Sequence, residues 1–317
     1  MQQYKEIKHL ANAIYGDVVL CKDNKSGHLV VIKRAIIEHC KAHKPVAQQY
    51  RHVIVSEDIY VERKLLRELS QGRGHPHVLR LVADFDTKEA HHFVVEYCSK
   101  GDLFDVLYKA PGCRFDLTQA QTYFRQIVSA VAFLHAKGYA HRDLSFENVL
   151  VNDKNECKLM DFGLAVDLYT PQTAEVGKPY YMPPEVASRC SSSPPYDPAK
   201  VDVWALGIML FIMLTGNQLF DKAVDRYANF QIFKSSGLRG LVASNKRWAA
   251  TMPTHVLDLL DKMIRMNPAE RMTIDQVASH AFVNLSATTP IDRTKKGDAN
   301  PMKWLEMRFP RLSFTAK

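Results

Sequence analysis

The sequence predicts an α+β fold in which a small strand-rich part is followed by a larger helical part. β-rich apolar runs are confined to roughly the first hundred residues, whereas helical spacing of apolar residues dominates from about Leu103 onward. The composition, with 46% hydrophobic and 24% charged residues, is that of an ordinary globular protein and excludes wholesale disorder, collagen-like repeats and a coiled coil. A chain of 317 residues also buries enough surface to fold without disulfides or structural metals.

Strands are expected in the N-terminal part of the chain. Residues 18–21 and 29–32 are β-rich runs, and the turn-like residues 23–27 separate them. Two further short apolar strands are expected around residues 78–82 and 93–96. Together these runs predict a small sheet near the N-terminus.

Helices are expected over residues 56–70 and 118–137. In the first of these, Ser56 is a suitable N-cap and apolar residues recur at helical spacing, while the second is a long amphipathic stretch. Beyond residue 283 the periodicity is lost, so residues 284–317 are interpreted as a tail. Four apolar residues of this tail could dock on the body of the protein, namely Trp304, Leu305, Phe309 and Phe314.

The longest apolar run, residues 203–215, is interpreted as a buried helix, because a bilayer-spanning helix needs about 18 or more apolar residues. Asp202 is expected to cap the start of this helix, and Gly216 follows its end. The opening residues, MQQYKEIKHL, lack the apolar core of a signal peptide. No membrane span is therefore expected.

Cysteine spacing and charge narrow the possible classes of function. The six cysteines form no CxxC pair and match no zinc-site spacing, which predicts free thiols in an intracellular protein of the cytoplasm or nucleus. The net charge of +8 comes from scattered basic residues, without an RRM, zinc-finger or helix-turn-helix pattern. A solvated basic surface is the favoured interpretation, and no nucleic-acid partner is expected.

The strongest functional signal is an ordered series of short motifs. Residues 141–148 read HRDLSFEN and residues 161–163 read DFG; Pro184-Glu185 and Asp202-Val203-Trp204 follow. A single DFG tripeptide occurs by chance, but the complete series at this spacing does not. It resembles the protein-kinase catalytic domain, of the serine/threonine type, and the resemblance covers about residues 4–283.

The resemblance implies a bilobal protein-kinase-like fold with a small β-rich N-lobe and a larger α-helical C-lobe. The expected boundaries are residues 4–95 for the N-lobe, 96–101 for the hinge and 102–283 for the C-lobe, followed by the tail. The implied activity is transfer of the γ-phosphate of ATP to serine or threonine hydroxyls of protein substrates. The alternative is a pseudokinase, a nucleotide-binding or scaffold module on the same fold.

The implied chemistry accounts for the residue types. Phosphoryl transfer passes through a loose, in-line transition state, so the enzyme must neutralise phosphate charge, place the metal and aim the nucleophile. By resemblance, Asn148 and Asp161 would bind Mg²⁺, which prefers oxygen ligands. Asp143 would accept or orient the hydroxyl proton, and Lys33, at the end of an apolar strand, would hold the α- and β-phosphates of ATP.

Lys33 needs a glutamate partner, and three candidates stand nearby: Glu57, Glu62 and Glu68. Glu62 is chosen because the leucines that follow it, and then His75-Pro76, match the helix and turn of the family. The resemblance further implies a buried ion pair between Glu185 and Arg271.

The resemblance also implies a nucleotide-base site. The adenine would lie between four apolar residues: Leu10, Val18, Val31 and Leu150. The hinge would begin after Val95, and backbone groups of Glu96 and Cys98 would pair with the purine edge. Because Val95 is small, a roomy pocket is expected behind the adenine.

The glycine-rich phosphate loop departs from the family pattern. The pattern GxGxxGxV falls on residues 11–18, where only Gly16 is kept and Ala11 and Ala13 replace the first two glycines. Glycine allows close approach of backbone N–H groups to phosphate. Val31 also replaces the usual alanine over the adenine. Both changes predict weaker ATP binding, and the loop is the feature that supports the pseudokinase alternative.

A lysine and a hydroxyl residue have exchanged places relative to the family. Ser145 stands where serine/threonine kinases usually have lysine, and Lys178 follows Gly177 where they usually have threonine. In the family these two side chains meet beside the catalytic aspartate. Lys178 is therefore expected to supply the positive charge that stabilises the γ-phosphate.

Regulation and substrate preference are also suggested by the sequence. Thr173, with Thr170 as second choice, is the expected site of phosphorylation by an upstream kinase or by the chain itself, and Arg142 would bind the phosphate.

Asp102 and Glu147 occupy positions that are acidic in arginine-preferring kinases, which predicts substrates with an arginine N-terminal to the target. The alternative role for Asp102 is to bond the ribose of ATP.

Overall fold

The computed structural model describes residues 3–46 and 56–284. These residues form two compact units. Unit 1 contains the described residues up to Val106 together with Glu147–Leu164, and unit 2 contains Leu107–Phe146 and the described residues from Ala165 onward. The predicted tail after Asn284, including its four apolar residues, lies outside the described residues.

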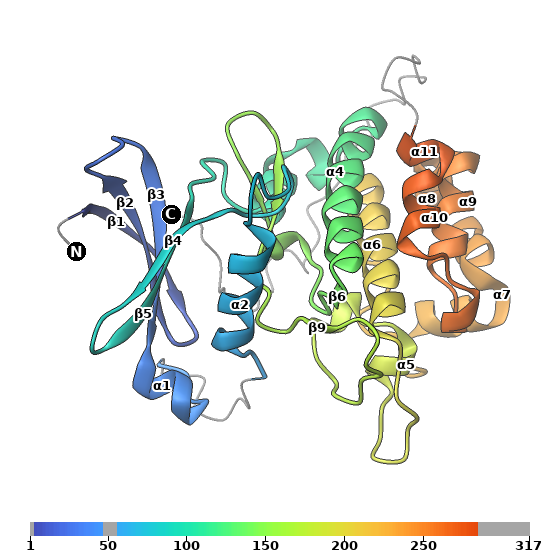
Figure 1. Ribbon diagram of the computed structural model, residues 1–317. Coiled ribbons are helices and arrows are strands. Elements are labelled where there is room, and N and C mark those ends of the chain that lie inside the picture. The colour runs from blue at the N-terminus through green and yellow to red at the C-terminus, as the bar shows by residue number, and fades with distance from the viewer. Residues whose placement is uncertain (1–2, 47–55, 285–317) are drawn as a thin grey trace. The chain divides into compact units, whose positions relative to one another are not determined.

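Unit 1 is built on an antiparallel five-stranded sheet in the order β1-β2-β3-β5-β4 (Figure 1). Sequence neighbours β3 and β4 are not adjacent, because β5 pairs with both of them. Helix α1 follows β3, and helix α2 comes after it along the chain and buries its leucines. The bounds are β1 Tyr4–Ala13, β2 Gly16–Asp23, β3 Leu29–Ile36, α1 Ile37–Ala42, α2 Ile59–Leu69, β4 Leu81–Asp86 and β5 Ala90–Glu96.

Two local predictions in this unit were wrong. The N-cap of α2 is Asp58 and not Ser56: the Asp58 carboxylate accepts hydrogen bonds from the N–H groups of Tyr60 at 2.8 Å and Val61 at 3.3 Å. Strand β4 starts at Leu81, later than the predicted residue 78. Residues 78–79 instead pair with Leu159, where Leu79 N–H donates to the Leu159 carbonyl at 2.9 Å.

The segment Glu147–Leu164 joins unit 1 through this pairing. It forms a hairpin of β7 (Val149–Val151) and β8 (Cys157–Leu159). Val151 N–H donates to the Gly101 carbonyl at 2.8 Å, and Leu159 N–H donates to the His77 carbonyl at 2.8 Å. The division by contacts therefore differs from the lobe boundaries expected from the sequence, which stay a prediction.

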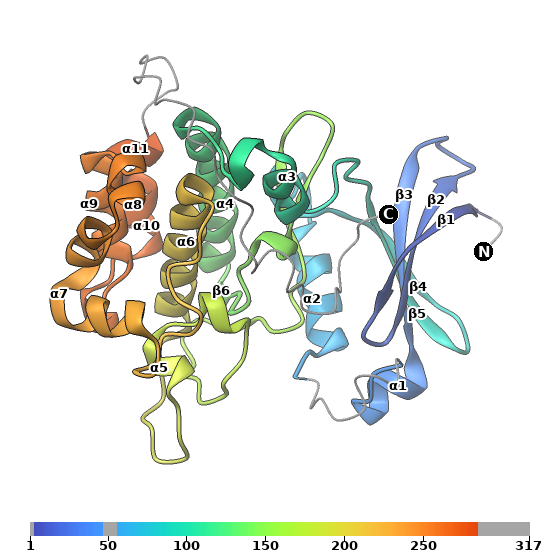
Figure 2. The ribbon, with the colours of Figure 1, turned by 180° about the vertical axis from the view of Figure 1, so that it is seen from behind.

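Unit 2 is helical, with α4 and α6 side by side at its centre (Figure 2). Short strands β6 (Tyr139–Ala140) and β9 (Val166–Asp167) pair with each other. Helix α3 (Leu103–Lys109) begins in unit 1 and ends in unit 2. The helices are α4 Leu117–Ala136, α5 Pro184–Ala187, α6 Pro198–Thr215, α7 Ala228–Ser244, α8 Lys246–Thr251, α9 Thr254–Met263, α10 Ile274–Ser279 and α11 Ala281–Asn284.

Helix α6 is the core of unit 2. It begins earlier than predicted, and its cap is Asp197, which accepts from Ala199 N–H at 2.8 Å; Asp202, the predicted cap, lies fully buried inside the helix. Gly216 ends it in the left-handed conformation with φ of 67°, as glycine commonly does. Among the described residues α6 is the one helix long and apolar enough to cross a membrane, but 89% of it is buried within the protein. It is therefore interpreted as a core helix.

The hairpin between β1 and β2 depends on Gly16. Its register places Gly16 opposite Ala35 of β3, and a Cβ atom on Gly16 would lie 2.1 Å from the Arg34 carbonyl oxygen. Since that oxygen belongs to the backbone of a central strand, it has little freedom to move. Glycine is therefore required here by the close approach of β3.

We expect Gly16→Ala to lower the free energy of unfolding by about 2 kcal/mol or more, because the added methyl group collides with the β3 backbone. Gly27→Ala is the matched control: Gly27 has φ of 77° but nothing within 4 Å of an added Cβ. It should lose only about 1 kcal/mol from backbone strain. Urea denaturation measures both changes, and equal losses in the two variants would contradict the collision.

Candidate active site

An ion pair between the sheet and helix α2 forms the centre of the site in unit 1. Lys33 of β3 places its Nζ 2.7 Å from Oε1 and 2.6 Å from Oε2 of Glu62. Of the three candidate glutamates, Glu62 is thus the one that contacts Lys33. Burial opposes the charge of Lys33, but the carboxylates of Glu62, Asp161 and Glu57 outweigh it and raise the pKa of Lys33. Lys33 is therefore a firmly charged ammonium group.

Lys33 and Glu62 line one pocket together with Asp161, Glu57 and the tip of the β1–β2 hairpin. Tyr15, at this tip, is buried and its hydroxyl donates to the Glu57 carbonyl at 2.9 Å. Burial, followed by the charge of Glu57, raises the pKa of Tyr15 to about 12. The sequence reasoning did not include Tyr15, although an aromatic residue in the hairpin turn was the available signal.

Asn148 and Asp161 are brought together by the β7–β8 hairpin. Met160 N–H donates to the Asn148 carbonyl at 3.0 Å, which extends the ladder by one step and sets Asp161 beside the start of β7. Asp161 has a positive φ of 63°, a conformation that is uncommon outside glycine and is found at functional positions.

The donors at this position suit Mg²⁺ in the presence of a nucleotide. An amide and a carboxylate offer hard oxygen ligands, and Mg²⁺ typically takes one or two protein carboxylates plus phosphate and water. Within residues 3–46 and 56–284 there is no group of three or more His, Cys, Asp or Glu side chains that could hold a metal ion by themselves. The oxygen atoms of Asn148 and Asp161 therefore suit Mg²⁺ only together with phosphate and water ligands.

The four predicted adenine residues belong to one buried apolar cluster of unit 1. They are joined there by Val95 of β5 and by Cys98 of the predicted hinge, so the fold gathers the cluster from β1, β2, β3, β5 and β7 together with the segment after β5. Two further members, Leu79 and Met160, were missed; the apolar position before DFG was the signal for Met160. The buried members are Leu10, Val18, Val31, Leu79, Val95, Cys98, Leu150 and Met160.

The predicted hinge residues keep their backbone near this cluster. Glu96 uses its side chain elsewhere: Oε1 accepts from Arg80 N–H at 2.9 Å, and Oε2 lies 3.1 Å from Lys158 Nζ. Burial raises the pKa of the Cys98 thiol to about 12, so Cys98 is a protonated, apolar contact. A role for both residues in purine binding therefore rests on their backbone groups.

The alanines of the phosphate loop are accommodated without backbone strain. Both lie in β1, where Ala11 pairs with Val18 and Ala13 pairs with Gly16. Neither adopts a positive φ. Since extended backbone suits any residue, replacing glycine at these positions does not distort the hairpin.

Asp143 and Lys178 form an ion pair within unit 2. Lys178 Nζ lies 2.7 Å from Oδ2 of Asp143, and their side chains are 24% and 11% exposed. Ser145 is fully buried, and its hydroxyl has no hydrogen-bond partner among the described residues. The ammonium group beside Asp143 therefore comes from the segment after Gly177.

Asp202 holds the backbone that presents Asp143. Its carboxylate accepts from the N–H groups of His141 and Arg142, each at 2.8 Å, and lies 2.9 Å from Nε2 of His135. Arg142 has a positive φ of 64°, so these bonds stabilise an uncommon conformation. His135, one of the partners of Asp202, was not foreseen from the sequence.

A second buried ion pair anchors the segment that follows Lys178. Arg271 contacts Glu185 through two parallel bonds of 2.5 and 2.7 Å, and its guanidinium lies 4.9 Å from the ring centre of Trp204. The Arg271 side chain has no exposed surface. Removing either partner would strand a buried charge at a cost of about 3–5 kcal/mol.

Residues Gln172 and Thr173 are held by contacts with three other residues. Arg142 Nη1 donates to the Gln172 side-chain oxygen at 3.2 Å. The backbones of Gln172 and Tyr196 exchange two hydrogen bonds of 2.9 and 2.8 Å. The carbonyl of Thr173 accepts from Arg189 Nε at 2.8 Å. Arg142 thus has a neutral amide among its partners.

The two acidic residues proposed for substrate arginine differ in exposure. Asp102 is fully buried, and its Oδ1 accepts from Asp105 N–H at 2.7 Å in the first turn of α3. Glu147 is partly exposed, and its Oε2 has no hydrogen-bond partner among the residues described. The Glu147 carboxylate is therefore partly exposed although its Oε2 is buried, whereas the buried Asp102 accepts a bond at the start of α3.

Comparison with known proteins agrees with this geometry. The family model "Protein kinase domain" matches residues 4–283. The chain therefore belongs to the protein kinase family.

Curated relatives carry serine/threonine kinase names or names of related kinases. NUAK family SNF1-like kinase 1 from Homo sapiens is 30% identical over 285 residues, which cover 89% of this chain and 38% of the relative. The serine/threonine-protein kinase chk1 of Schizosaccharomyces pombe is 32% identical over 236 residues, covering 72% of this chain and 44% of the relative. The chain thus spans less than half the length of these relatives.

Proposed function

We propose that the chain is an active serine/threonine protein kinase. The observation that carries the proposal is the pocket in which the Lys33–Glu62 ion pair faces Asp161. An ammonium group kept charged by the neighbouring carboxylates can bind phosphate oxygens, and Asp161 with Asn148 can hold the metal that accompanies them. The relatives named as serine/threonine kinases support the same class of acceptor.

Each residue then has a role in the proposed reaction. Bound Mg²⁺ would neutralise charge on the β- and γ-phosphates. Lys33 would orient the α- and β-phosphates, held in place by Glu62. Asp143 would accept a hydrogen bond from the substrate hydroxyl and take its proton as the oxygen attacks the γ-phosphorus and the bond from that phosphorus to the leaving ADP breaks. Lys178, beside Asp143, would stabilise charge on the transferred phosphoryl group, as preorganised electrostatics requires.

Substrate selection and location follow from two further features. We propose that Glu147 selects an arginine N-terminal to the target residue, because its partly exposed carboxylate can form a charge-assisted bond with a guanidinium. We place the protein inside the cell, in the cytoplasm or nucleus, since all six cysteines lie within the described residues and are free thiols.

Thr173 is kept as the proposed phosphorylation site, with a modulating role. Because Gln172 already gives Arg142 a partner, a phosphate on Thr173 would add a stronger, charged contact to a segment that is ordered without it. The basal enzyme would therefore transfer phosphate before it is modified.

Incubating the purified chain with radiolabelled ATP, Mg²⁺ and a generic basic protein tests the function. We expect label on serine and threonine of the substrate, lost in Asp161→Ala because the metal loses its carboxylate. Mass spectrometry of the same sample shows whether Thr173 becomes phosphorylated. Equal labelling by wild type and Asp161→Ala would favour a binding module.

We expect Lys178→Ala to lower kcat by ~10²-fold, because the γ-phosphate loses its nearby positive charge. Lys222→Ala is the matched control: Lys222 is 23% exposed and pairs with Glu175 at 2.7 Å, so it loses a similar ion pair at another place. The double variant Ser145→Lys with Lys178→Thr should regain much of the activity. Steady-state kinetics that show neither the loss nor the recovery would remove Lys178 from the mechanism.

We expect Glu147→Gln to reduce the preference for arginine over alanine N-terminal to the target by about tenfold, because a charge-assisted bond becomes a neutral one. A peptide library measures the preference at each position. Glu156→Gln, on the same hairpin region, is the control, since Glu156 bonds Asn152. An arginine preference that is unchanged in Glu147→Gln would assign recognition to other residues.

A further inference from the structure

One row of residues across the unit 1 sheet links Lys33 to an acidic residue two strands away. The register pairs Lys33 of β3 with Phe93 of β5, and Phe93 with Asp84 of β4. Directly opposed residues of antiparallel strands point to the same face of a sheet. Lys33, Phe93 and Asp84 therefore share one face, and Glu62 and Arg63 of α2 bond the two ends of their row.

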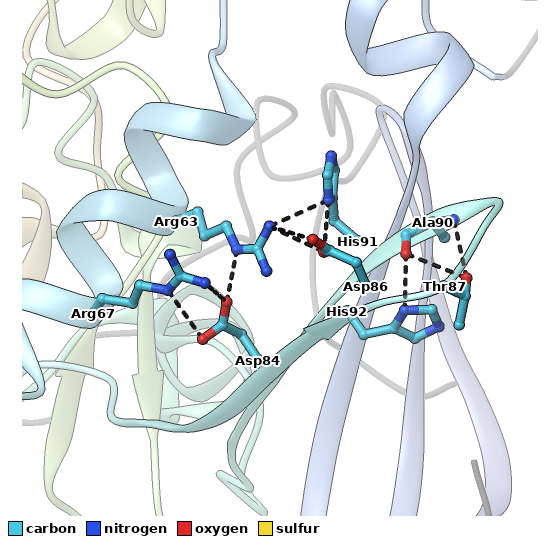
Figure 3. Close-up of polar contacts among 8 residues, drawn as sticks. All are labelled: Arg63, Arg67, Asp84, Asp86, Thr87, Ala90, His91 and His92. Carbon is cyan, nitrogen blue, oxygen red and sulfur yellow. Dashed lines mark hydrogen bonds and ion pairs between the residues drawn. The ribbon is translucent and has the colours of Figure 1, made fainter.

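The residue after Glu62 makes the second contact. Arg63 Nε donates to Asp84 Oδ2 at 2.6 Å, and its Nη1 donates to Asp86 Oδ2 at 3.1 Å (Figure 3). The Arg63 guanidinium also lies 5.9 Å from the ring centre of Phe93, in the middle of the row. The side chains of Arg63 and Asp84 are only 14% and 12% exposed, so this contact is partly shielded from water.

The surrounding contacts single out Arg63 on this helix. Arg67 also bonds Asp84, but its side chain is 54% exposed, which makes its ion pair the weaker one. Asp86 is shared with His91, whose Nδ1 lies 2.8 Å from Asp86 Oδ1. The network in Figure 3 thus ties α2 to both β4 and β5, with Arg63 as the residue that contacts both aspartates.

Consecutive residues of an α-helix point about 100° apart around its axis. Glu62 and Arg63 bond opposite ends of the row formed by Lys33, Phe93 and Asp84. Both contacts can form only when α2 has one particular rotation about its own axis. We propose that Arg63 is a positioning residue, which holds α2 at the rotation that places the Glu62 carboxylate on Lys33. The catalytic consequence rests on the proposed kinase function, whereas the structural link between Arg63 and Lys33 does not.

The link can be measured on Lys33 itself, without an activity assay. A lysine held in an ion pair reacts slowly with an amine-acylating reagent, since acylation needs the free amine. Mass spectrometry after brief acylation of the full chain gives the rate at Lys33. We expect Arg63→Met to raise this rate about threefold or more, and Asp84→Asn to do the same, while Arg67→Met changes it less than twofold.

A double-variant cycle separates positioning from general loosening of the fold. In Glu62→Gln the ion pair is already lost, so adding Arg63→Met should raise the Lys33 rate no further if Arg63 acts through Glu62. If Arg63 only stabilised the fold, Arg63→Met would raise the acylation rate of Lys33 equally in the wild-type and Glu62→Gln backgrounds. Arg63→Lys keeps the charge, but a lysine can bond only one of the two aspartates well. We expect its acylation rate at Lys33 to lie between those of wild type and Arg63→Met.

The outcomes are distinct. Faster acylation of Lys33 in Arg63→Met and Asp84→Asn, absent in the Glu62→Gln background, supports the inference. An unchanged Lys33 rate in both variants, or an equal increase with and without Glu62, overturns it. If wild type transfers phosphate, Arg63→Met should also lower kcat/KM for ATP by about tenfold, again only when Glu62 is present. If wild type transfers none, the proposed function fails and the acylation rates still decide the inference.

Discussion

The ion pair between Lys33 and Glu62 is the interaction on which unit 1 depends. Only 15% and 7% of the two side chains are exposed, so each charge relies on the other in place of water. Breaking such a pair leaves an uncompensated charge and costs about 3–5 kcal/mol. The position of helix α2 relative to strand β3 must therefore stay fixed. Many contacts in unit 1 hold either the strand or the helix in place.

The strand is held from both sides. Strands β2 and β5 flank β3, and Gly16 allows the β1–β2 hairpin to lie against its backbone. The helix is held by Asp58 at its start, by its buried leucines and by Arg63. Asp161 reaches the same pocket because the β7–β8 hairpin pairs with residues 77–79 next to β4. The charged groups of this pocket are thus positioned by backbone hydrogen bonds rather than by closeness in sequence.

Sequence reasoning predicted the parts that are carried by residue type at fixed spacing. The family, the strand-then-helix order, the Lys33–Glu62 contact and the meeting of Lys178 with Asp143 all followed from motifs. Helix caps and strand limits were harder to predict, because several nearby residues can serve as the N-cap of one helix. Asp58 stands two positions after Ser56 at the start of α2, and Asp197 precedes Asp202 at the start of α6. Contacts such as Arg63 with Asp84 were not predicted, since they depend on the register of strands that pair across the sheet.

Backbone conformation explains why alanine is tolerated at two family glycine positions, whereas Gly177 is kept. Ala11 and Ala13 lie in extended backbone, where a methyl group causes no strain. Gly177 has φ of 98°, and a Cβ atom there would lie 2.8 Å from the Arg142 carbonyl oxygen. Lys178 follows this glycine and contacts Asp143. Because Coulomb attraction depends on distance and surroundings, and not on which segment carries the charge, Lys178 puts a positive charge beside Asp143 although the two residues are 35 positions apart in the sequence.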